Sequence, residues 1–179
     1  MQPPARADTN QPSAYHLIEI TAATPPETLA AARELLFEYG YFVRSHSVAT
    51  FCFGALEEEA TQLPISYLCT GGGALLATHS DRPIGFVAWR GLPEFNLTGA
   101  WEIKRLWIRP EARGLGLARI LMQSIEDRAR AAGKSRLLLD TAPNVMAAAV
   151  RLYRDLGFTE CSAYRGQSHP GILYFQKWL

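Results

Sequence analysis

RPEARGLGLARIL, residues 109–121, places three arginines and two glycines between a strand-like segment and a helix-like one. The preceding residues, AWEIKRLWIR (100–109), alternate in the manner of a β-strand. This alternation predicts that one face of the strand carries Glu102, Lys104, Leu106 and Ile108. From Leu117 onward apolar residues recur at helical spacing, and Gly133 can end that helix. The stretch therefore predicts a strand, a turn and a helix in direct succession.

The turn has the features of an anion site. A helix start leaves about four backbone N–H groups unpaired and carries roughly half a positive charge, so phosphate groups bind there readily. Gly114 and Gly116 omit the side chains that would keep an anion away, and Arg113 offers a forked donor. The alternative is a tight turn in which the glycines serve only the backbone and the arginines are solvated.

Two nucleotide-binding motifs do not fit the turn. A phosphate loop of the nucleotide hydrolase type would end in Gly-Lys-Ser/Thr, whereas Gly116 is followed by Leu-Ala-Arg. A dinucleotide fingerprint would carry a glycine or alanine three positions after Gly116, and that position is Arg119. Both classes are therefore disfavoured.

The rest of the chain predicts strands and helices on either side of this unit. The expected elements are an edge strand over 15–21, a helix over 25–39 closed by Gly40, a short helix over 55–62, a hairpin formed by 74–79 and 84–90, a buried strand over 135–141, a helix capped by Asn144 and ended by Gly157, and a last strand over 172–178.

Composition indicates a soluble globular protein. Hydrophobic residues make up 48% and charged residues 20%, and the net charge of +1 provides no basic field for a nucleic acid. The three cysteines, Cys52, Cys69 and Cys161, are odd in number and far apart, which favours a reducing cytoplasm. The sequence contains no run of ~18 apolar residues, the length that a membrane-spanning helix needs. Residues 1–14 predict a disordered N-terminal tail, and residues 15–179 a single domain.

Two segments together resemble a known family. Arg113-x-x-Gly116-x-Ala118, preceded by a strand that ends in Leu106-Trp107-Ile108-Arg109-Pro110, resembles motif A of the Gcn5-related N-acetyltransferase superfamily. Downstream, Asn144 followed by Leu152-Tyr153-Arg154-Asp155-Leu156-Gly157-Phe158 looks like motif B of that family. The likeness is strongest over residues 74–158.

The resemblance implies an α/β (α+β) fold with a mixed, mostly antiparallel sheet, flanked by helices and splayed where the strand containing Trp107 parts from the strand over 135–141. It also implies acetyl-coenzyme A as co-substrate. No metal is expected, because Cys52 and Cys69 lack a paired Cys-x-x-Cys or histidine spacing. The cofactor-binding positions that it carries over lie on the strand, in the turn and at the start of the later helix: Leu106, Trp107, Ile108, Arg113, Gly114, Leu115, Gly116, Leu117, Ala118 and Asn144.

Two residues are candidates for catalysis. An alkylamine with a pKa of ~10.4 is mostly protonated at neutral pH, so a base must remove a proton before it attacks a thioester. Glu102 resembles the catalytic glutamate of some family members; the alternative is a strand carboxylate paired with Lys104 or a nearby arginine. Tyr153 resembles the tyrosine that protonates the departing thiolate; the alternative is a tyrosine that packs in the core.

The sequence thus predicts an N-acetyltransferase that moves an acetyl group from acetyl-coenzyme A to a primary amine by direct attack in a ternary complex. The alternative is a non-catalytic acyl-coenzyme A sensor or regulatory module. The acceptor, a small-molecule or peptide amine, is expected to contact residues 37–59 and 163–172, with Tyr164 and His169 as candidate contacts. We expect a cytoplasmic location and no nucleic-acid or membrane partner. The sequence leaves both a monomer and a homodimer open.

Overall fold

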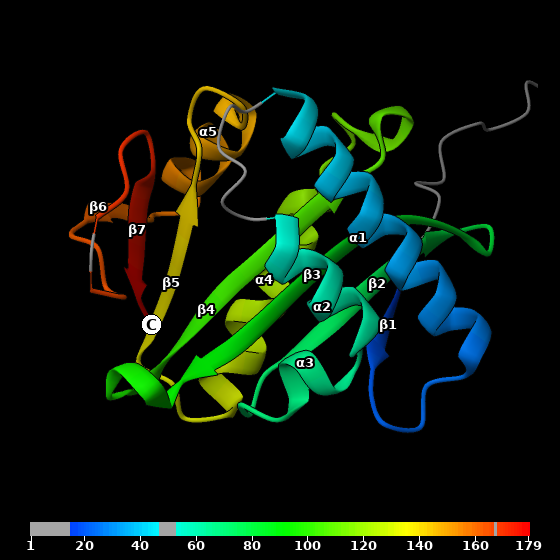
Figure 1. Ribbon diagram of the computed structural model, residues 1–179, viewed down its shortest axis with the longest axis horizontal. Coiled ribbons are helices and arrows are strands. Elements are labelled where there is room, and N and C mark those ends of the chain that lie inside the picture. The colour runs from blue at the N-terminus through cyan, green and yellow to red at the C-terminus, as the bar shows by residue number, and fades with distance from the viewer. Residues whose placement is uncertain (1–14, 47–52, 167) are drawn as a thin grey trace, which may run out of the picture.

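The computed structural model describes residues 15–46, 53–166 and 168–179. They form a seven-stranded sheet in the order β1-β2-β3-β4-β5-β7-β6, with helices on both faces (Figure 1). Neighbouring strands are antiparallel, except for β4 and β5, which are parallel. The predicted mixed, mostly antiparallel sheet is confirmed. The tail predicted over residues 1–14 lies outside the described residues.

The bounds of most elements match the sequence pattern. The strands are β1 (His16–Ile20), β2 (Gly73–His79), β3 (Arg82–Leu92), β4 (Leu97–Ile108), β5 (Arg136–Thr141), β6 (Thr159–Cys161) and β7 (Leu173–Trp178). The helices are α1 (Pro26–His46), α2 (Phe53–Thr61), α3 (Ile65–Leu68), α4 (Leu117–Ala131) and α5 (Ala147–Asp155), with short 3-10 turns at Pro93–Phe95 and Pro110–Ala112.

Alternating strand residues build two cores, one on each face of the sheet. Leu76 and Phe86 pack with Leu36 and other residues of α1 to α3. Their strand neighbours Leu75 and Val87 point the other way and pack with residues of α4 and α5. All five of these side chains are less than 2% exposed, so the sheet is buried on both sides.

Helix α1 is longer than predicted. It runs to His46, and Gly40 is buried inside it instead of closing it. The rings of Tyr39 and Phe42, on either side of this glycine, contact the ring of Trp107, with centroids 6.2 and 5.1 Å away. This packing outweighs the cost of about 1 kcal/mol that a glycine imposes within a helix.

Strand β4 contains a bulge at Arg105, whose φ angle is +60°. The register against β3 shifts here, and β4 carries one extra residue. As a result, Leu106 and Ile108 pack in the core against α4. The prediction that they share a face with Glu102 and Lys104 is wrong, because alternation holds only along a regular strand.

Candidate active site

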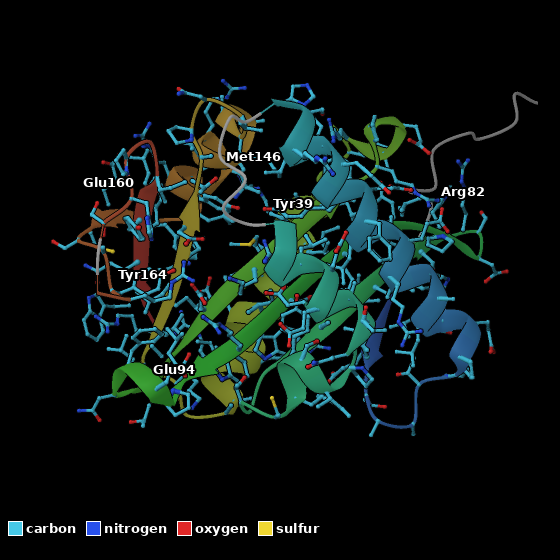
Figure 2. The ribbon with its side chains drawn as sticks, in the orientation of Figure 1. Tyr39, Arg82, Glu94, Met146, Glu160 and Tyr164 are labelled. Carbon is cyan, nitrogen blue, oxygen red and sulfur yellow. The ribbon has the colours of Figure 1, made fainter. Side chains whose placement is uncertain are left out.

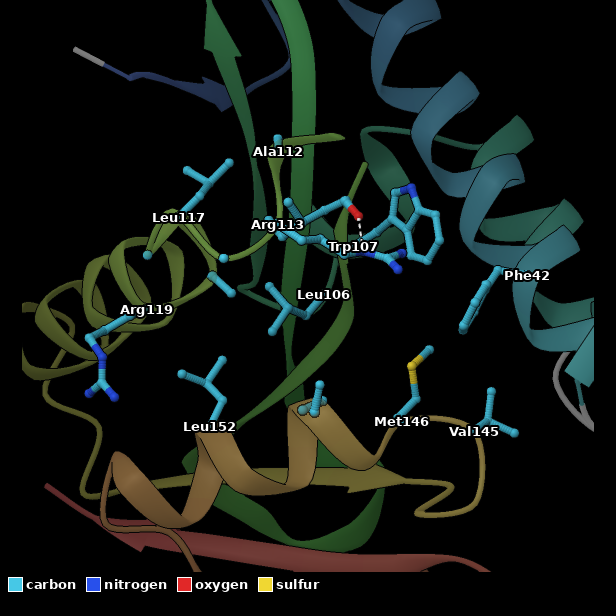
Figure 3. Close-up of a pocket in the computed structure, with 16 residues that line it drawn as sticks. Phe42, Leu106, Trp107, Ala112, Arg113, Leu117, Arg119, Val145, Met146 and Leu152 are labelled. Carbon is cyan, nitrogen blue, oxygen red and sulfur yellow. Dashed lines mark hydrogen bonds between the residues drawn. The ribbon is translucent and has the colours of Figure 1, made fainter. Parts of the chain in front are cut away.

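Strands β4 and β5 separate in the middle of the sheet. Their pairing ends with Glu102 opposite Leu138, although β4 continues to Ile108. The splay predicted between the central strands is therefore confirmed. A cavity of about 340 Å³ lies between this part of β4, the turn before α4 and the start of α5 (Figure 3). The predicted cofactor residues that line it are Leu106, Trp107, Ile108, Arg113, Gly114, Gly116, Leu117 and Ala118.

The turn before α4 requires its two glycines. Gly114 and Gly116 have φ angles of +78° and +82°, a region that other residues enter only with strain. A Cβ atom at either position would meet nothing within 4 Å, so the space beside the backbone is open. Gly116 is also the N-cap of α4, and no side chain of the described residues caps the first amides of the helix. These amides are available to an anion.

Arg113 lies against the aromatic side of the cavity. Its guanidinium carbon is 4.8 Å from the centroid of the Trp107 ring and 5.5 Å from that of Phe42. Its Nε donates a 3.0 Å hydrogen bond to the carbonyl oxygen of Ile108. This bond and the stacking orient the guanidinium, and no other hydrogen bond from it to a described residue is formed. Arg109, in contrast, is engaged by Glu38 of α1 and does not line the cavity.

Two predicted cofactor residues do not line this cavity. The side chain of Leu115 is 64% exposed. Asn144 was expected to cap the following helix, but α5 begins at Ala147 and has Met146 as its N-cap. Asn144 lies in a turn closed by two hydrogen bonds to the carbonyl of Ala142, and this turn delays the start of the helix. The capping prediction is therefore wrong.

A second cavity of about 500 Å³ adjoins the first, and Val145 and Met146 line both. Figure 2 labels three of its lining residues, Tyr39, Glu94 and Met146, which come from three different parts of the fold. His169, a predicted acceptor contact, also lines it. The second cavity thus collects segments that the sequence associates with acceptor binding.

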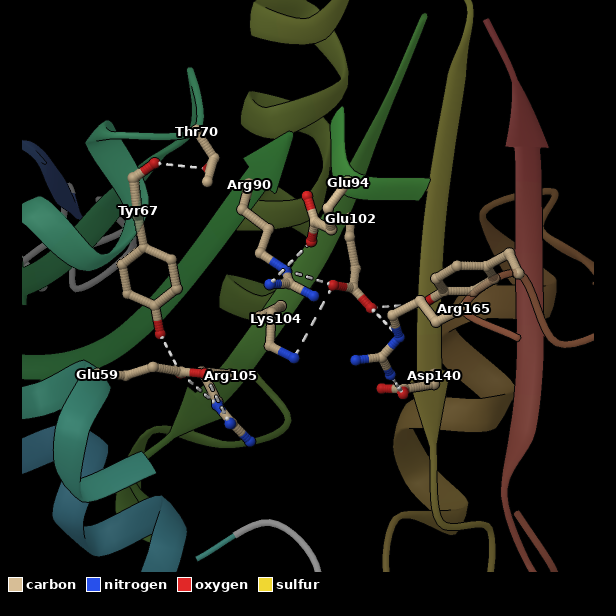
Figure 4. A network of polar contacts seen from close by, with 11 residues as sticks. Glu59, Tyr67, Thr70, Arg90, Glu94, Glu102, Lys104, Arg105, Asp140 and Arg165 are labelled. Atoms are coloured by element: carbon tan, nitrogen blue, oxygen red, sulfur yellow. Dashed lines mark hydrogen bonds and ion pairs between the residues drawn. The ribbon is translucent and has the colours of Figure 1, made fainter. Parts of the chain in front are cut away.

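Glu102 lies at the centre of a buried polar network (Figure 4) and is fully buried. Its Oε2 accepts a 2.7 Å hydrogen bond from Nε of Arg90, and its Oε1 accepts a 2.8 Å bond from the hydroxyl of Tyr164. Nε of Arg165 is 3.1 Å from Oε1, and Nζ of Lys104 is 3.9 Å from Oε2. The contacts match the alternative in which Glu102 is an ion-paired strand carboxylate.

The charges around Glu102 set its ionisation. Burial works to raise the pKa of Glu102, but Lys104 and the two arginines outweigh it, so the pKa lies below the ordinary value of 4.5. The carboxylate is therefore ionised at neutral pH. Glu102 lines neither of these two cavities, nor a smaller cavity of about 40 Å³ that Tyr153 lines.

Tyr153 reaches the gap between the splayed strands from α5. Together with Leu106 and Lys104 it lines a cavity of about 40 Å³, which Met146 also lines and which lies beside the two larger ones. Burial, followed by the proximity of Tyr39, raises the pKa of Tyr153 above its ordinary value of 10. Among the residues that the structure describes, none forms a hydrogen bond with its hydroxyl. Tyr153 thus presents a protonated, unpaired donor to this cavity.

Sequence reasoning missed several charged residues of the second cavity. Arg165, from the segment after β6, forms an ion pair with Asp140 at the end of β5. Arg105 forms two hydrogen bonds to the carboxylate of Glu59, at 2.8 and 3.0 Å. No local pattern indicates these pairs, because their members are far apart in the sequence. The sequence pattern indicates Lys104 only as an ion-pair partner of Glu102.

Comparison with known proteins identifies the family. The model of the acetyltransferase (GNAT) family matches residues 41–158, and the chain belongs to this family. The match contains β4, the glycine turn, the cavity beside it and Tyr153. An acetyltransferase from Streptococcus agalactiae 2603 has the same fold, with a TM-score of 0.72 and 19% identity over 92% of this chain and 98% of that chain. PaiA N-acetyltransferase from Thermoplasma acidophilum, in complex with coenzyme A, has a TM-score of 0.70 and 14% identity over 93% and 99% of the two chains.

Two curated relatives match parts of the sequence. An uncharacterised N-acetyltransferase of Schizosaccharomyces pombe is 37% identical over 82 residues, 46% of this chain and 50% of that protein. An IAA acetyltransferase of Azospirillum brasilense is 47% identical over 62 residues, 35% of this chain and 40% of that protein. The chain spans half or less of the length of these relatives.

Within the described ranges, 15–46, 53–166 and 168–179, no helix combines the length and the apolar character needed to cross a membrane. Within the same ranges, no group of three or more histidine, cysteine or acidic side chains is placed to hold a metal ion.

Proposed function

We propose that the protein transfers an acetyl group from acetyl-coenzyme A to a primary amine, by direct attack while both substrates are bound. The observation that carries this proposal is that three cavities share Met146, and that the smallest of them contains Tyr153. One larger cavity ends at an uncapped helix start, and the other is lined by charged side chains. Two substrates bound in this way would meet between the splayed strands.

The first cavity fits coenzyme A. The turn from Arg113 to Ala118 combines free amides, open space at both glycines and an oriented guanidinium, which together suit a pyrophosphate. Beyond Glu102, the side of β4 that faces β5 pairs with no strand among the described residues, so its backbone polar groups can bind an extended arm. The chemistry that acetyl-coenzyme A supplies is an acetyl thioester, whose carbonyl carbon is open to nucleophiles.

The end of β4 can also polarise the thioester carbonyl. We propose that a backbone N–H of Trp107 or Ile108 donates a hydrogen bond to the carbonyl oxygen as negative charge develops on it. Both residues line the first cavity and belong to a strand held rigidly by its pairing with β3. Fixed donors of this kind act without reorganisation during the reaction.

Tyr153 would act on the departing sulfur. Its raised pKa keeps the hydroxyl protonated, and the hydroxyl has no partner among the described residues. It can therefore donate a hydrogen bond to the thiolate as the bond to carbon breaks. Because a phenol is a weaker acid than a thiol, this stabilising bond is the main contribution, and the proton follows it.

Glu102 would position other groups instead of accepting a proton. Its lowered pKa makes it a weak base, and three cations surround it. It holds Tyr164 together with Arg90 and Arg165, and because both arginines line the second cavity it fixes one wall of that cavity. We assign it this role in place of the general-base role expected from the resemblance.

Calorimetry and a thiol-release assay test the proposal. Acetyl-coenzyme A should bind at a single site, and one or more members of a panel of amino acids, polyamines, aryl alkylamines and short peptides should release free thiol and become acetylated. Binding without thiol release from any amine would favour the sensor or regulatory module. No binding of acetyl-coenzyme A would exclude both functions.

A further inference from the structure

Lys104 has an unusual environment for a lysine. Its side chain is only 11% exposed, although lysines almost always keep the ammonium group in water. Among the described residues it forms one ion pair, to Glu102, which spans 3.9 Å. Within the part of the chain that the structure describes, Nζ forms no hydrogen bond. A mostly buried lysine that lines two cavities, and whose ammonium forms no hydrogen bond with the described residues, points to a role in function.

Lys104 lies where two of the three cavities adjoin. It lines the 500 Å³ cavity and the 40 Å³ cavity, and Tyr153 lines the latter as well. Lys104 precedes the bulge at Arg105, so it faces away from the core against α4. Tyr153, a proton donor, and Lys104, a second titratable group, thus border the space where a bound amine and a thioester would meet.

We propose that Lys104, in its neutral form, accepts the proton that the acceptor ammonium must lose before attack. This inference rests on the proposed acetyl transfer and adds the group that carries the proton away. It assigns to Lys104 the task for which the sequence suggested Glu102.

The surroundings of Lys104 suit this task. Burial lowers its pKa from 10.5 to about 8, against the opposing influence of Glu102. A base acts best when its pKa lies near the working pH, and a carboxylate below 4.5 is much further from the pKa of an alkylamine. The titratable and charged groups that act on Lys104 or line its two cavities are Glu102 and Arg105 of β4, Glu59 of α2, Tyr39 of α1, Asp140 of β5, Arg90 of β3, Glu94 of the turn after β3, Tyr153 of α5, Tyr174 of β7, and Arg165 and His169 after β6.

The acceptor nitrogen loses two protons during the reaction, and Lys104 takes the first. An N–H bond of the acceptor ammonium breaks, its electron pair stays on the nitrogen, and Nζ of Lys104 forms the new N–H bond. The neutral amine forms a C–N bond to the acetyl carbon while the C–S bond breaks, and the sulfur keeps that electron pair. The nitrogen then loses a second proton, which balances the one taken up by the sulfur. Lys104 releases its proton to water through the larger cavity.

Nuclear magnetic resonance tests the ionisation directly, because the chain contains only three lysines, Lys104, Lys134 and Lys177. In protein labelled with ¹³C at the lysine ε-carbons, one signal should titrate near pH 8 and be missing from Lys104→Met. If no lysine signal titrates below about pH 10, the ordinary range for this side chain, the inference is wrong. This measurement requires no turnover, so it is independent of the proposed function.

Kinetics test the role, with the best amine of the panel as acceptor. Lys104→Met and Lys104→Arg should each lower kcat at pH 7 by roughly 100-fold and remove the wild-type rise in kcat centred near pH 8. The arginine variant keeps the charge but cannot accept a proton, so full activity in it would overturn the inference. Lys134→Met, at a partly exposed residue outside the cavities, is the matched control. A wild-type protein that binds acetyl-coenzyme A and releases no thiol would instead overturn the proposed function, and this inference with it.

Discussion

The hydroxyl of Tyr164 donates a 2.8 Å hydrogen bond to Oε1 of Glu102, and this bond ties the segment after β6 to the central strand β4. The neighbouring Arg165 reaches the same carboxylate oxygen at 3.1 Å. A segment that borders the 500 Å³ cavity is therefore anchored on a buried charge from the middle of the sheet.

Removing this anchor should destabilise the protein. Tyr164→Phe leaves the buried carboxylate without one of its donors, and a hydrogen bond to a charged group contributes about 1.5–3 kcal/mol. The free energy of unfolding in urea should fall by an amount in this range. Tyr15→Phe is the control, because the ring contact of Tyr15 with His79 survives the change. Equal stability of Tyr164→Phe and the wild type would show that the bond contributes nothing.

The ionisation of Glu102 should make stability depend on pH. Its pKa in the folded protein lies below 4.5, so its contribution is present above that value and is lost as the pH falls through the folded pKa. Glu102→Gln should lower the unfolding free energy at pH 7, and its stability should fall less steeply than that of the wild type below about pH 4.5. Glu57→Gln, at an exposed position on α2, should retain the wild-type slope. Parallel slopes for Glu102→Gln and the wild type would contradict the assignment.

Gly116→Val should weaken cofactor binding. The valine would be strained at a φ of +82° and would place its side chain in the open space beside the helix amides. Gly133→Val, at the other end of α4, has a similar φ of +68° and equally open space, so it controls for the strain. Calorimetry should show at least a roughly tenfold loss of acetyl-coenzyme A affinity for Gly116→Val alone. Normal binding by this variant would refute the anion site.

Tyr153→Phe should separate turnover from binding. The loss of a donor to the departing thiolate should lower kcat by roughly 10- to 100-fold. The Kd for acetyl-coenzyme A and the unfolding free energy should stay near their wild-type values, because the hydroxyl has no hydrogen-bond partner among the described residues. A large loss of cofactor affinity would mean that Tyr153 serves only the structure.

Local sequence patterns predicted the strand, the turn and the helix around Gly114 and Gly116 well. The turn from Arg113 to Ala118 could be recognised because its positive φ angles require glycine and because the strand and helix beside it have clear periods. The splay between β4 and β5 could also be predicted, because the family resemblance that implies it rests in part on the residues of this turn. Binding by these residues stays a prediction.

The acceptor side could not be predicted in the same way. The bulge at Arg105 breaks the alternation on which the orientation of Glu102 and Lys104 was based. The partners of Glu102 come from β3 and from the segment after β6, so its ionisation depends on contacts between distant parts of the chain. Asn144 fails as a cap because a turn on the Ala142 carbonyl intervenes before α5.

The most direct test of acetyl transfer is a paired assay of thiol release and product mass with purified protein, acetyl-coenzyme A and the amine panel. We predict that at least one amine gains a single acetyl group for each thiol released, and that Gly116→Val and Tyr153→Phe both lower this rate while Gly133→Val does not. Tight binding of acetyl-coenzyme A with no acetylated amine anywhere in the panel would contradict the proposed function.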